Sequence, residues 1–347
     1  MGCHTPLKAY RTRIGEKGKV PEYGISFKEN DPSAIYETYL PCGRCIGCRL
    51  ERSRQWAVRC IHEAQTSGPS CFITLTYNQQ NLPKGGTLKK DHFVDFMKRL
   101  RKKFVPKNPY HPKLAPKSRE WFQYKYGIRY FMCGEYGDEE SRPHYHACLF
   151  NIDLPDKKHH KMHRGNPYYT SEILDDLWEN KGWCYISDVT FESAAYVARY
   201  CTKKINGPSS EKHYNGREPE YSTQSSRPAI GLKWIERYYE DVYSSDCVRV
   251  KGRGVRAPRY YDKYIEKFYS SLYNRVKEKR ENVAMLFAHT DEADLERMLV
   301  KHKLQVLRMS KLKRSYENQR EDYKPLLPYD EKALEYNALM VNNRRKI

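Results

Sequence analysis

The centre of the sequence reads Ile128-Arg-Tyr-Phe-Met-Cys-Gly-Glu135, then a polar stretch over 136–143, then His144-Tyr-His-Ala-Cys-Leu-Phe-Asn151. Both outer runs have the length and apolar content of buried strands. The short polar stretch between them predicts a β-hairpin. This hairpin is the element around which the rest of the fold is expected to assemble.

Other helices and strands are expected on both sides of the hairpin. Apolar residues recur at helical spacing over 49–66, 93–104 and 192–204, and Ser171 can cap a helix that ends near Gly182. Runs rich in β-branched and aromatic residues predict strands over 71–77 and from Trp183 to Ile186. The order is mixed, without the regular strand–helix alternation of a parallel sheet. The sequence therefore predicts an α+β fold with an antiparallel sheet flanked by helices.

Three regions lie outside these predicted helices and strands. The first 40 residues are polar and irregular, 105–127 is a loop rich in proline and lysine, and the chain after residue 265 is charged with a helical period. We therefore expect an N-terminal segment with a cysteine knuckle and a helix over 1–65, a central domain over 66–265, and a helical tail over 266–347.

Composition limits the classes of partner. The chain has 347 residues, with 63 Lys and Arg against 43 Asp and Glu, a net charge of +20. Such a surplus favours a polyanion, either nucleic acid or an anionic membrane surface. Mean hydropathy is −0.91, and no apolar run approaches the roughly 18 residues of a membrane span. Eleven cysteines without a secretion signal indicate reduced thiols in a cytoplasm.

Three of these cysteines form a compact motif. Cys42, Cys45 and Cys48 lie within seven residues just before a predicted helix, a spacing that metal-binding knuckles use. Cys3, His4 or Cys60 is a candidate fourth ligand. An iron–sulfur run would place a fourth cysteine where Arg52 stands. Structural zinc and unliganded core thiols both remain open.

Two pairs of polar side chains are spaced for chemistry. His144 and His146 are two residues apart on a predicted strand, so both imidazoles face one side and can hold a divalent cation. Tyr196 and Tyr200 are four apart on a predicted helix, so both hydroxyls share one face. Either spacing, taken alone, also arises by chance among histidines and tyrosines that have only a structural role.

The motifs, in chain order, resemble a known family. Phe72-Ile-Thr-Leu-Thr-Tyr77, Arg142-Pro-His-Tyr-His-Ala147 and Tyr196-Val-Ala-Arg-Tyr-Cys-Thr-Lys-Lys204 are similar to the three motifs of two-tyrosine HUH endonucleases, which initiate rolling-circle replication. The cysteine knuckle, Arg49-Leu-Glu-Arg-Ser-Arg-Gln-Trp56 and Gly134-Glu-Tyr-Gly137 resemble the initiators of gokushoviruses, single-stranded DNA phages of the microvirus family. The resemblance covers roughly 40–265 and includes Ser226-Arg-Pro-Ala-Ile-Gly231 and Arg256-Ala-Pro-Arg-Tyr-Tyr261.

The resemblance implies a set of roles. A tyrosine, Tyr196 or Tyr200, would attack the origin DNA, leaving a 5′-phosphotyrosine and a free 3′-OH, and the enzyme would later rejoin the displaced strand. A divalent cation, Mg²⁺ or Mn²⁺, would be held by His144 and His146, with Glu135 as third ligand. Lys203 would support catalysis, and the expected DNA contacts are Lys204, Arg199, Thr74 and Thr76. The family often has lysine between the tyrosines, where this chain has Arg199.

The same resemblance implies partners and a location. Single-stranded DNA and the replication origin are the expected substrates, with a host helicase and DNA polymerase as partners in the host cytoplasm and no membrane. Region 66–265 would be the nicking–joining domain. A non-catalytic single-stranded nucleic-acid-binding protein with a zinc knuckle is the alternative that charge and aromatic content also allow. Relaxases and transposases fit less well, because relaxases usually place the tyrosine before the histidines and transposases usually carry one.

Overall fold

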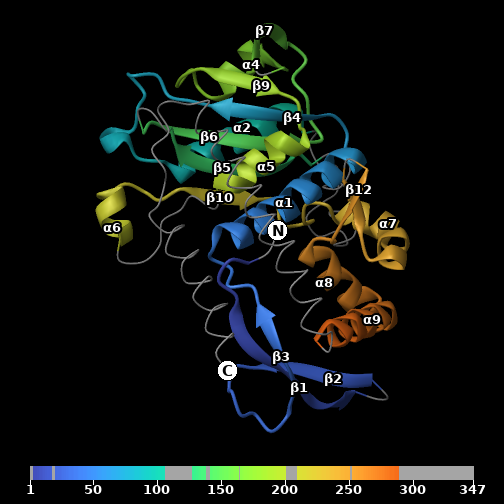
Figure 1. Cartoon of the computed structure of the whole chain (residues 1–347). Helices are drawn as coiled ribbons and strands as arrows, with labels where there is room; N and C mark the ends of the chain where they lie inside the picture. The colour runs from blue at the N-terminus through green and yellow to red at the C-terminus, as the bar shows by residue number, and fades with distance from the viewer. Residues whose placement is uncertain are drawn as a thin grey trace, which may run out of the picture. The chain divides into compact units, whose positions relative to one another are not determined.

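A computed structural model describes residues 3–17, 20–105, 127–137, 141–163, 165–200, 209–250 and 252–288. The chain divides into two compact units (Figure 1). The first comprises Met1–Glu51 and Lys263–Ile347, and the second Arg52–Asp262. The three-part division into 1–65, 66–265 and 266–347 stays a prediction.

The first unit contains β1 (Leu7–Lys17), β2 (Val20–Ser26), β3 (Ala34–Leu40) and α9 (Ser270–Ala288). Two helices have residues in both units: α1 (Ile46–Thr66) and α8 (Arg259–Phe268). The second unit contains β4 (Ser70–Leu75), η1 (Lys84–Gly86), α2 (Lys90–Phe104), β5 (Arg129–Tyr136), β6 (Pro143–Phe150), β7 (Lys158–His163), β8 (Asn166–Thr170), α4 (Glu172–Leu177), β9 (Cys184–Ser187), α5 (Phe191–Tyr200), α6 (Ser209–Tyr214), β10 (Tyr221–Gln224), α7 (Leu232–Ser245), β11 (Val248–Val250) and β12 (Arg253–Val255).

A seven-stranded antiparallel sheet forms the centre of the second unit. Its strand order is β10-β5-β6-β4-β9-β8-β7. The expected hairpin is the β5–β6 pair, in which Glu135 lies opposite His144 and Cys133 opposite His146. The predicted α+β class, with an antiparallel sheet flanked by helices, is confirmed. Strands β7 and β8 are polar and were not expected from the sequence.

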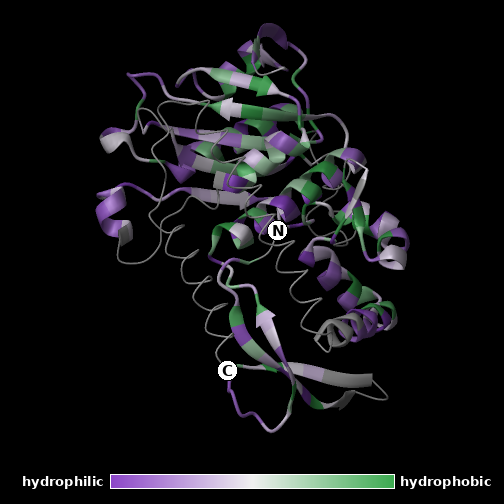
Figure 2. Ribbon diagram, in the orientation of Figure 1, coloured by the Kyte–Doolittle hydropathy of each residue, from purple (hydrophilic) through white to green (hydrophobic). Residues whose placement is uncertain are grey.

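The alternation of side chains along the strands produces two cores, one on each face of the sheet. On one face, α2 and α4 pack against Ile73, Leu75, Met132, Ala147, Leu149 and Ile186. On the other face, α1 and α5 pack against Phe72, Phe131, Cys133, Cys148 and Phe150. The strands of the large sheet carry much of the hydrophobic colouring in Figure 2. Each fully buried large apolar side chain contributes about 1.5–3 kcal/mol.

The ends of the helices follow the expected signals in part. Ser171 caps α4, because its Oγ accepts the N–H of Leu174 at 3.1 Å. That helix ends at Leu177 rather than near Gly182, since Glu179 and Asn180 have φ values of 59° and 53° that no helix contains. The predicted loop over 105–127 and the predicted helical turn over 201–204 lie mostly outside the described residues.

The first 40 residues correct an expectation. They form a three-stranded antiparallel sheet in the order β2-β1-β3 instead of irregular chain. The pattern was hidden because the buried side chains of β1 are small or polar, Ala9 and Thr12, so no apolar run marks the strand. Helix α9 packs on β3, and Glu281 accepts hydrogen bonds from Arg11 Nε at 3.1 Å and from the Tyr36 hydroxyl at 3.0 Å.

The C-terminal region beyond α9, residues 289–347, lies outside the described residues. Among the helices that are described, none combines the length and the apolar content that a bilayer span requires.

Candidate active site

Strands β5 and β6 bring two imidazoles and a carboxylate together. Glu135 Oε1 lies 2.8 Å from Nε2 of His144 and 2.9 Å from Nε2 of His146. Tyr145, between the histidines, points to the opposite face and packs in the core there. The two imidazoles therefore face the same side of the sheet, as their two-residue spacing predicts. The hairpin register places Glu135 opposite His144 and so adds the carboxylate.

Both imidazoles are oriented by hydrogen bonds on their other nitrogen. Nδ1 of His144 lies 3.1 Å from the carbonyl of Arg142. Because a carbonyl only accepts, Nδ1–H of His144 donates to it, which would leave the Nε2 lone pair for a cation bound between the ring and Glu135. Nδ1 of His146 lies 2.9 Å from Thr74 Oγ1, and this hydrogen bond orients the second ring. Such outer hydrogen bonds are typical of histidines that bind metals.

The donor set of this site fits a divalent cation. One donor atom from each of Glu135, His144 and His146 lies within 4.8 Å of the others. The Glu135 side chain is 1% exposed, and its Oε2 is buried with no hydrogen-bond partner among the described residues. A buried carboxylate oxygen of this kind is costly unless a cation or a donor meets it. We refer to these three residues as the His–Glu triad.

Helix α5 places a tyrosine at the His–Glu triad. The Tyr196 hydroxyl lies 3.5 Å from Glu135 Oε1, and its ring stands perpendicular to the His146 imidazole with 5.0 Å between the centroids. The helix begins at a reciprocal cap, in which Thr190 Oγ1 accepts from the N–H of Ser193 and Ser193 Oγ accepts from the N–H of Thr190. Burial of the small face that contains Ala194 and Ala198 holds α5 against the sheet.

The other predicted site residues are placed as follows. Tyr200 is the last residue of α5, one turn beyond Tyr196, and only its backbone is described. Arg199 is exposed on the same helix. Thr76 donates its hydroxyl to the carbonyl of Trp183 at 2.8 Å. Lys203 and Lys204 lie outside the described residues.

Thr74 has a contact that sequence reasoning missed. Its hydroxyl lies 2.9 Å from Nδ1 of His146, while its expected contact with DNA stays a prediction. The signal that would have found this contact is the register of β4 with β6, which sets Thr74 directly opposite His146. Register between distant strands depends on the whole sheet, so the local sequence does not supply it.

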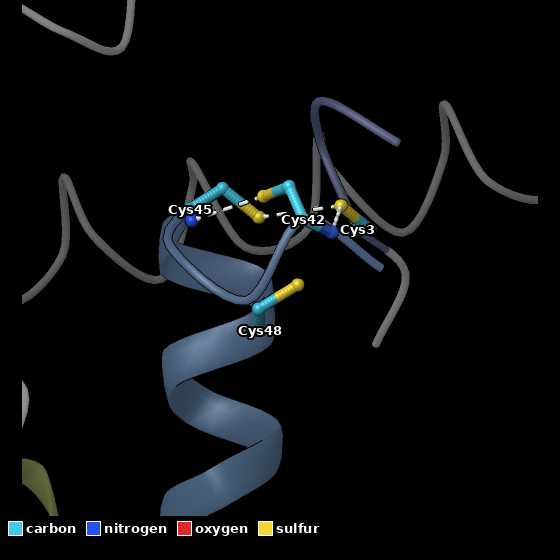
Figure 3. A group of neighbouring side chains, drawn as sticks. All are labelled: Cys3, Cys42, Cys45 and Cys48. Carbon is cyan, nitrogen blue, oxygen red and sulfur yellow. Dashed lines mark hydrogen bonds between the residues drawn. The ribbon is translucent and has the colours of Figure 1, made fainter. Parts of the chain in front are cut away.

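A second cluster of donors lies in the first unit (Figure 3). Cys3 lies beside Cys42, Cys45 and Cys48, and the four Sγ atoms are within 4.8 Å of one another. The sulfurs of Cys3 and Cys45 are 3.7 Å apart, close to the ~3.8 Å edge of a tetrahedron of thiolates around zinc at ~2.3 Å. Of the candidate fourth ligands, the geometry brings in Cys3. His4 contributes its backbone N–H to Cys45 Sγ at 3.3 Å.

The remaining candidate, Cys60, is a free thiol that is buried in the second unit and hydrogen-bonds with the Cys148 thiol. Within the cysteine cluster, burial raises the pKa of Cys42. Hydrogen bonds from the Thr5 hydroxyl and from the N–H groups of Cys45 and Arg44 outweigh that burial and lower the pKa to about 6. These hydrogen bonds favour the thiolate form of Cys42, which is the form that binds metals.

Comparison with known proteins identifies the family. The model of the family described as "Replication-associated protein ORF2/G2P" matches residues 70–205, which include the His–Glu triad and α5. "Replication-associated protein VP4" of Bdellovibrio phage phiMH2K is 35% identical over 85% of this chain and 88% of its own. "Replication-associated protein ORF2" of Spiroplasma virus 4 is 31% identical over 82% of this chain and 87% of its own.

A third relative, "Replication-associated protein ORF4" of Chlamydia phage 1, is 28% identical over 67% of this chain and 54% of its own. The chain belongs to the replication-associated proteins of the gokushoviruses. No solved structure matches it significantly.

Proposed function

We propose that this chain initiates rolling-circle replication by nicking one strand of the phage origin and later rejoins the displaced strand. The observation that carries the proposal is the Tyr196 hydroxyl 3.5 Å from Glu135 Oε1, beside two oriented imidazoles. A nucleophile, an oriented cation site and a large positive net charge are what cleavage of single-stranded DNA requires.

The chemistry is a transesterification. The tyrosine oxygen forms a bond to phosphorus while the bond to the 3′ oxygen breaks; the phenol loses a proton and the 3′ oxygen gains one. A phenol with an ordinary pKa of ~10 is a weak nucleophile at neutral pH. A divalent cation, Mg²⁺ or Mn²⁺, would supply the polarisation of the phosphate and the stabilisation of the leaving oxygen. His144, His146 and Glu135 would hold it.

The phosphotyrosine bond conserves the energy of the phosphodiester, so rejoining needs no nucleotide cofactor. Tyr196 and Tyr200, one helical turn apart, would allow the second cut while the first tyrosine still carries DNA. Lys203 is proposed to assist the tyrosine hydroxyl. Lys204, Arg199, Thr74 and Thr76 are proposed to contact the DNA. The free 3′-OH would prime a host polymerase that works with a host helicase in the host cytoplasm.

We test the cation site with His144→Ala and His146→Ala. Each variant should lose cleavage of a single-stranded origin oligonucleotide, because the cation loses a ligand. Affinity for that oligonucleotide in EDTA should stay within about threefold of wild type, since Lys and Arg contacts to phosphate dominate binding. Wild-type nicking by either variant in excess EDTA would contradict the assignment. Glu135→Ala tests the third ligand, and unchanged affinity for Mn²⁺ would remove it.

We also propose that the four cysteines hold structural zinc. Four sulfurs lie within 4.8 Å of one another, two of them 3.7 Å apart, and backbone N–H groups point at those two, which supports zinc over unliganded thiols. Cys3 precedes β1 and Cys42 follows β3, and these strands pair from Leu7 opposite Leu40. The ion would therefore fasten the open end of the β1–β3 ladder to the start of α1.

A further inference from the structure

Trp183 has the highest exposure of any large apolar side chain among the described residues, at 74%. Five residues earlier in the same segment, Trp178 is fully buried. Leaving an indole in water forgoes the large gain from burying an aromatic ring. An exposed tryptophan on a well-formed sheet therefore suggests a binding role.

The strand register places this indole on the same face as the His–Glu triad. Thr74 lies opposite His146 on one side and opposite Tyr185 on the other, so these three side chains share a face. Trp183 directly precedes β9 and is two residues before Tyr185, so strand alternation directs it to the side that Tyr185 faces, while Cys184 between them packs in the opposite core. Two strand spacings of ~4.8 Å separate β9 from β6, so the ring lies roughly 10 Å from the histidines.

The backbone that carries Trp183 is firmly held. Its carbonyl accepts from both the N–H and the hydroxyl of Thr76, at 3.1 and 2.8 Å. The preceding Gly182 approaches β4 so closely that a Cβ would lie 2.5 Å from the Thr76 carbonyl oxygen. The exposed ring is thus presented from a fixed backbone, which lowers the entropic cost of binding to it.

The aromatic surface continues to a basic edge of the sheet. Tyr168 on β8 lies 6.2 Å from Tyr185, centroid to centroid, and Lys161 Nζ on β7 lies 5.2 Å from the Tyr185 ring. In the sequence, residues 157–171 contain three lysines, one arginine and three histidines. Lys157 and Lys158 form ion pairs with the flanking Asp153 and Glu172, whereas Lys161 lies over the Tyr185 ring. This surface therefore suits an anion that also carries flat apolar groups.

We propose that Trp183 and Tyr185 form a stacking platform for unpaired bases of single-stranded DNA, with the β7–β8 edge binding the phosphates beyond it. The inference rests on the proposed nicking function and adds the position of the strand. Stacking tolerates any base, so the platform would hold the strand rather than read its sequence. At ~3.4 Å per nucleotide along one strand, the stacked bases would lie within roughly three nucleotides of the cleaved bond.

The test measures binding apart from chemistry. Fluorescence anisotropy with a labelled single-stranded oligonucleotide in EDTA reports affinity without cleavage. Trp183→Ala should weaken binding roughly tenfold, in the range of a lost base–aromatic stack. Trp183→Phe should stay within about threefold of wild type, and Trp183→Leu, which keeps apolar bulk without a flat ring, should be as weak as Ala. Val94→Ala, an exposed apolar change on α2 over the opposite face, is the matched control.

A single abasic position, moved along the oligonucleotide, locates the stacked base. At one or two positions the missing base should weaken wild-type binding and leave Trp183→Ala unaffected, because the ring and the base act as a pair. Wild-type affinity of Trp183→Ala, or Leu equal to Phe, would overturn the proposal. So would a change in oligomeric state on mutation with DNA affinity unchanged, which would make this surface a contact between copies of the chain.

The outcome stays separate from that of the proposed function. If no DNA adduct forms with any metal but the Trp183 effects appear, the platform stands and nicking fails. If the adduct forms and the Trp183 variants bind as wild type does, nicking stands and the platform fails.

Discussion

At the scale of single residues, the site depends on which ring nitrogen of each histidine can bind a cation. The carbonyl of Arg142 settles this for His144, and the hydroxyl of Thr74 orients His146. An imidazole that rotated away from this orientation could no longer bind the cation through Nε2. The surrounding hydrogen bonds therefore matter nearly as much as the ligands themselves.

Thr74→Val is predicted to weaken Mn²⁺ binding about tenfold or more, because it removes the hydroxyl that orients His146 and keeps the side-chain volume. Isothermal titration with Mn²⁺ measures the loss. Thr66→Val is the control, since the Thr66 hydroxyl donates to the His62 and Glu63 carbonyls of its own helix. Equal Mn²⁺ affinities for wild type and Thr74→Val would show that the hydroxyl has no orienting role.

At the scale of elements, the sequence predicts what is locally encoded. The hairpin, the α2 helix and the Ser171 cap follow from periodicity and capping rules, and the structure has all three. The three strands before residue 41 were missed, because the buried positions of the central strand β1 are small or polar, Ala9 and Thr12. The pairing of Thr74 with His146 was missed too, because it is set by strand order across the sheet rather than by neighbours in the chain.

Cys3→Ser tests the link between the cysteine cluster and the β1–β3 sheet. Wild-type protein, purified under reducing conditions, should contain about one zinc per chain, and the variant should lose most of it. Amide hydrogen exchange should speed up across β1 and β3 in the variant, since their open end is released. Cys247→Ser, in the second unit, should change neither quantity. Absence of zinc from fresh wild-type protein would contradict the assignment.

At the scale of the whole molecule, we expect His62 to make the second unit less stable as the pH falls. Its imidazole stacks on Trp234 and hydrogen-bonds with the Tyr261 hydroxyl at 2.8 Å, which joins α1, α7 and α8. Burial lowers the pKa of His62 to about 3, against ~6.5 in the unfolded chain. Between pH 6.5 and pH 3, His62 is therefore protonated in the unfolded state and neutral in the folded state.

The free energy of unfolding should consequently fall by up to ~1.4 kcal/mol for each pH unit below 6.5, until pH approaches 3. Urea unfolding followed by tryptophan fluorescence at pH 7, 6 and 5 measures this slope. His62→Gln should reduce the slope of the free energy of unfolding against pH by ~1.4 kcal/mol per pH unit, which corresponds to one proton. His160→Gln, at an exposed position of β7, should leave this slope unchanged. Identical slopes for wild type and His62→Gln would refute the role of this histidine.

The most direct test of the tyrosine mechanism is mass spectrometry of the protein after incubation with Mn²⁺ and single-stranded oligonucleotides that tile the phage genome encoding it. We predict a covalent DNA adduct on Tyr196 or Tyr200, with a slight preference for Tyr200. Each single Tyr→Phe variant should retain some cleavage and lose the coupled second cut. The Tyr196→Phe, Tyr200→Phe double variant should bind DNA normally and form no adduct. An adduct that survives in the double variant would contradict the mechanism.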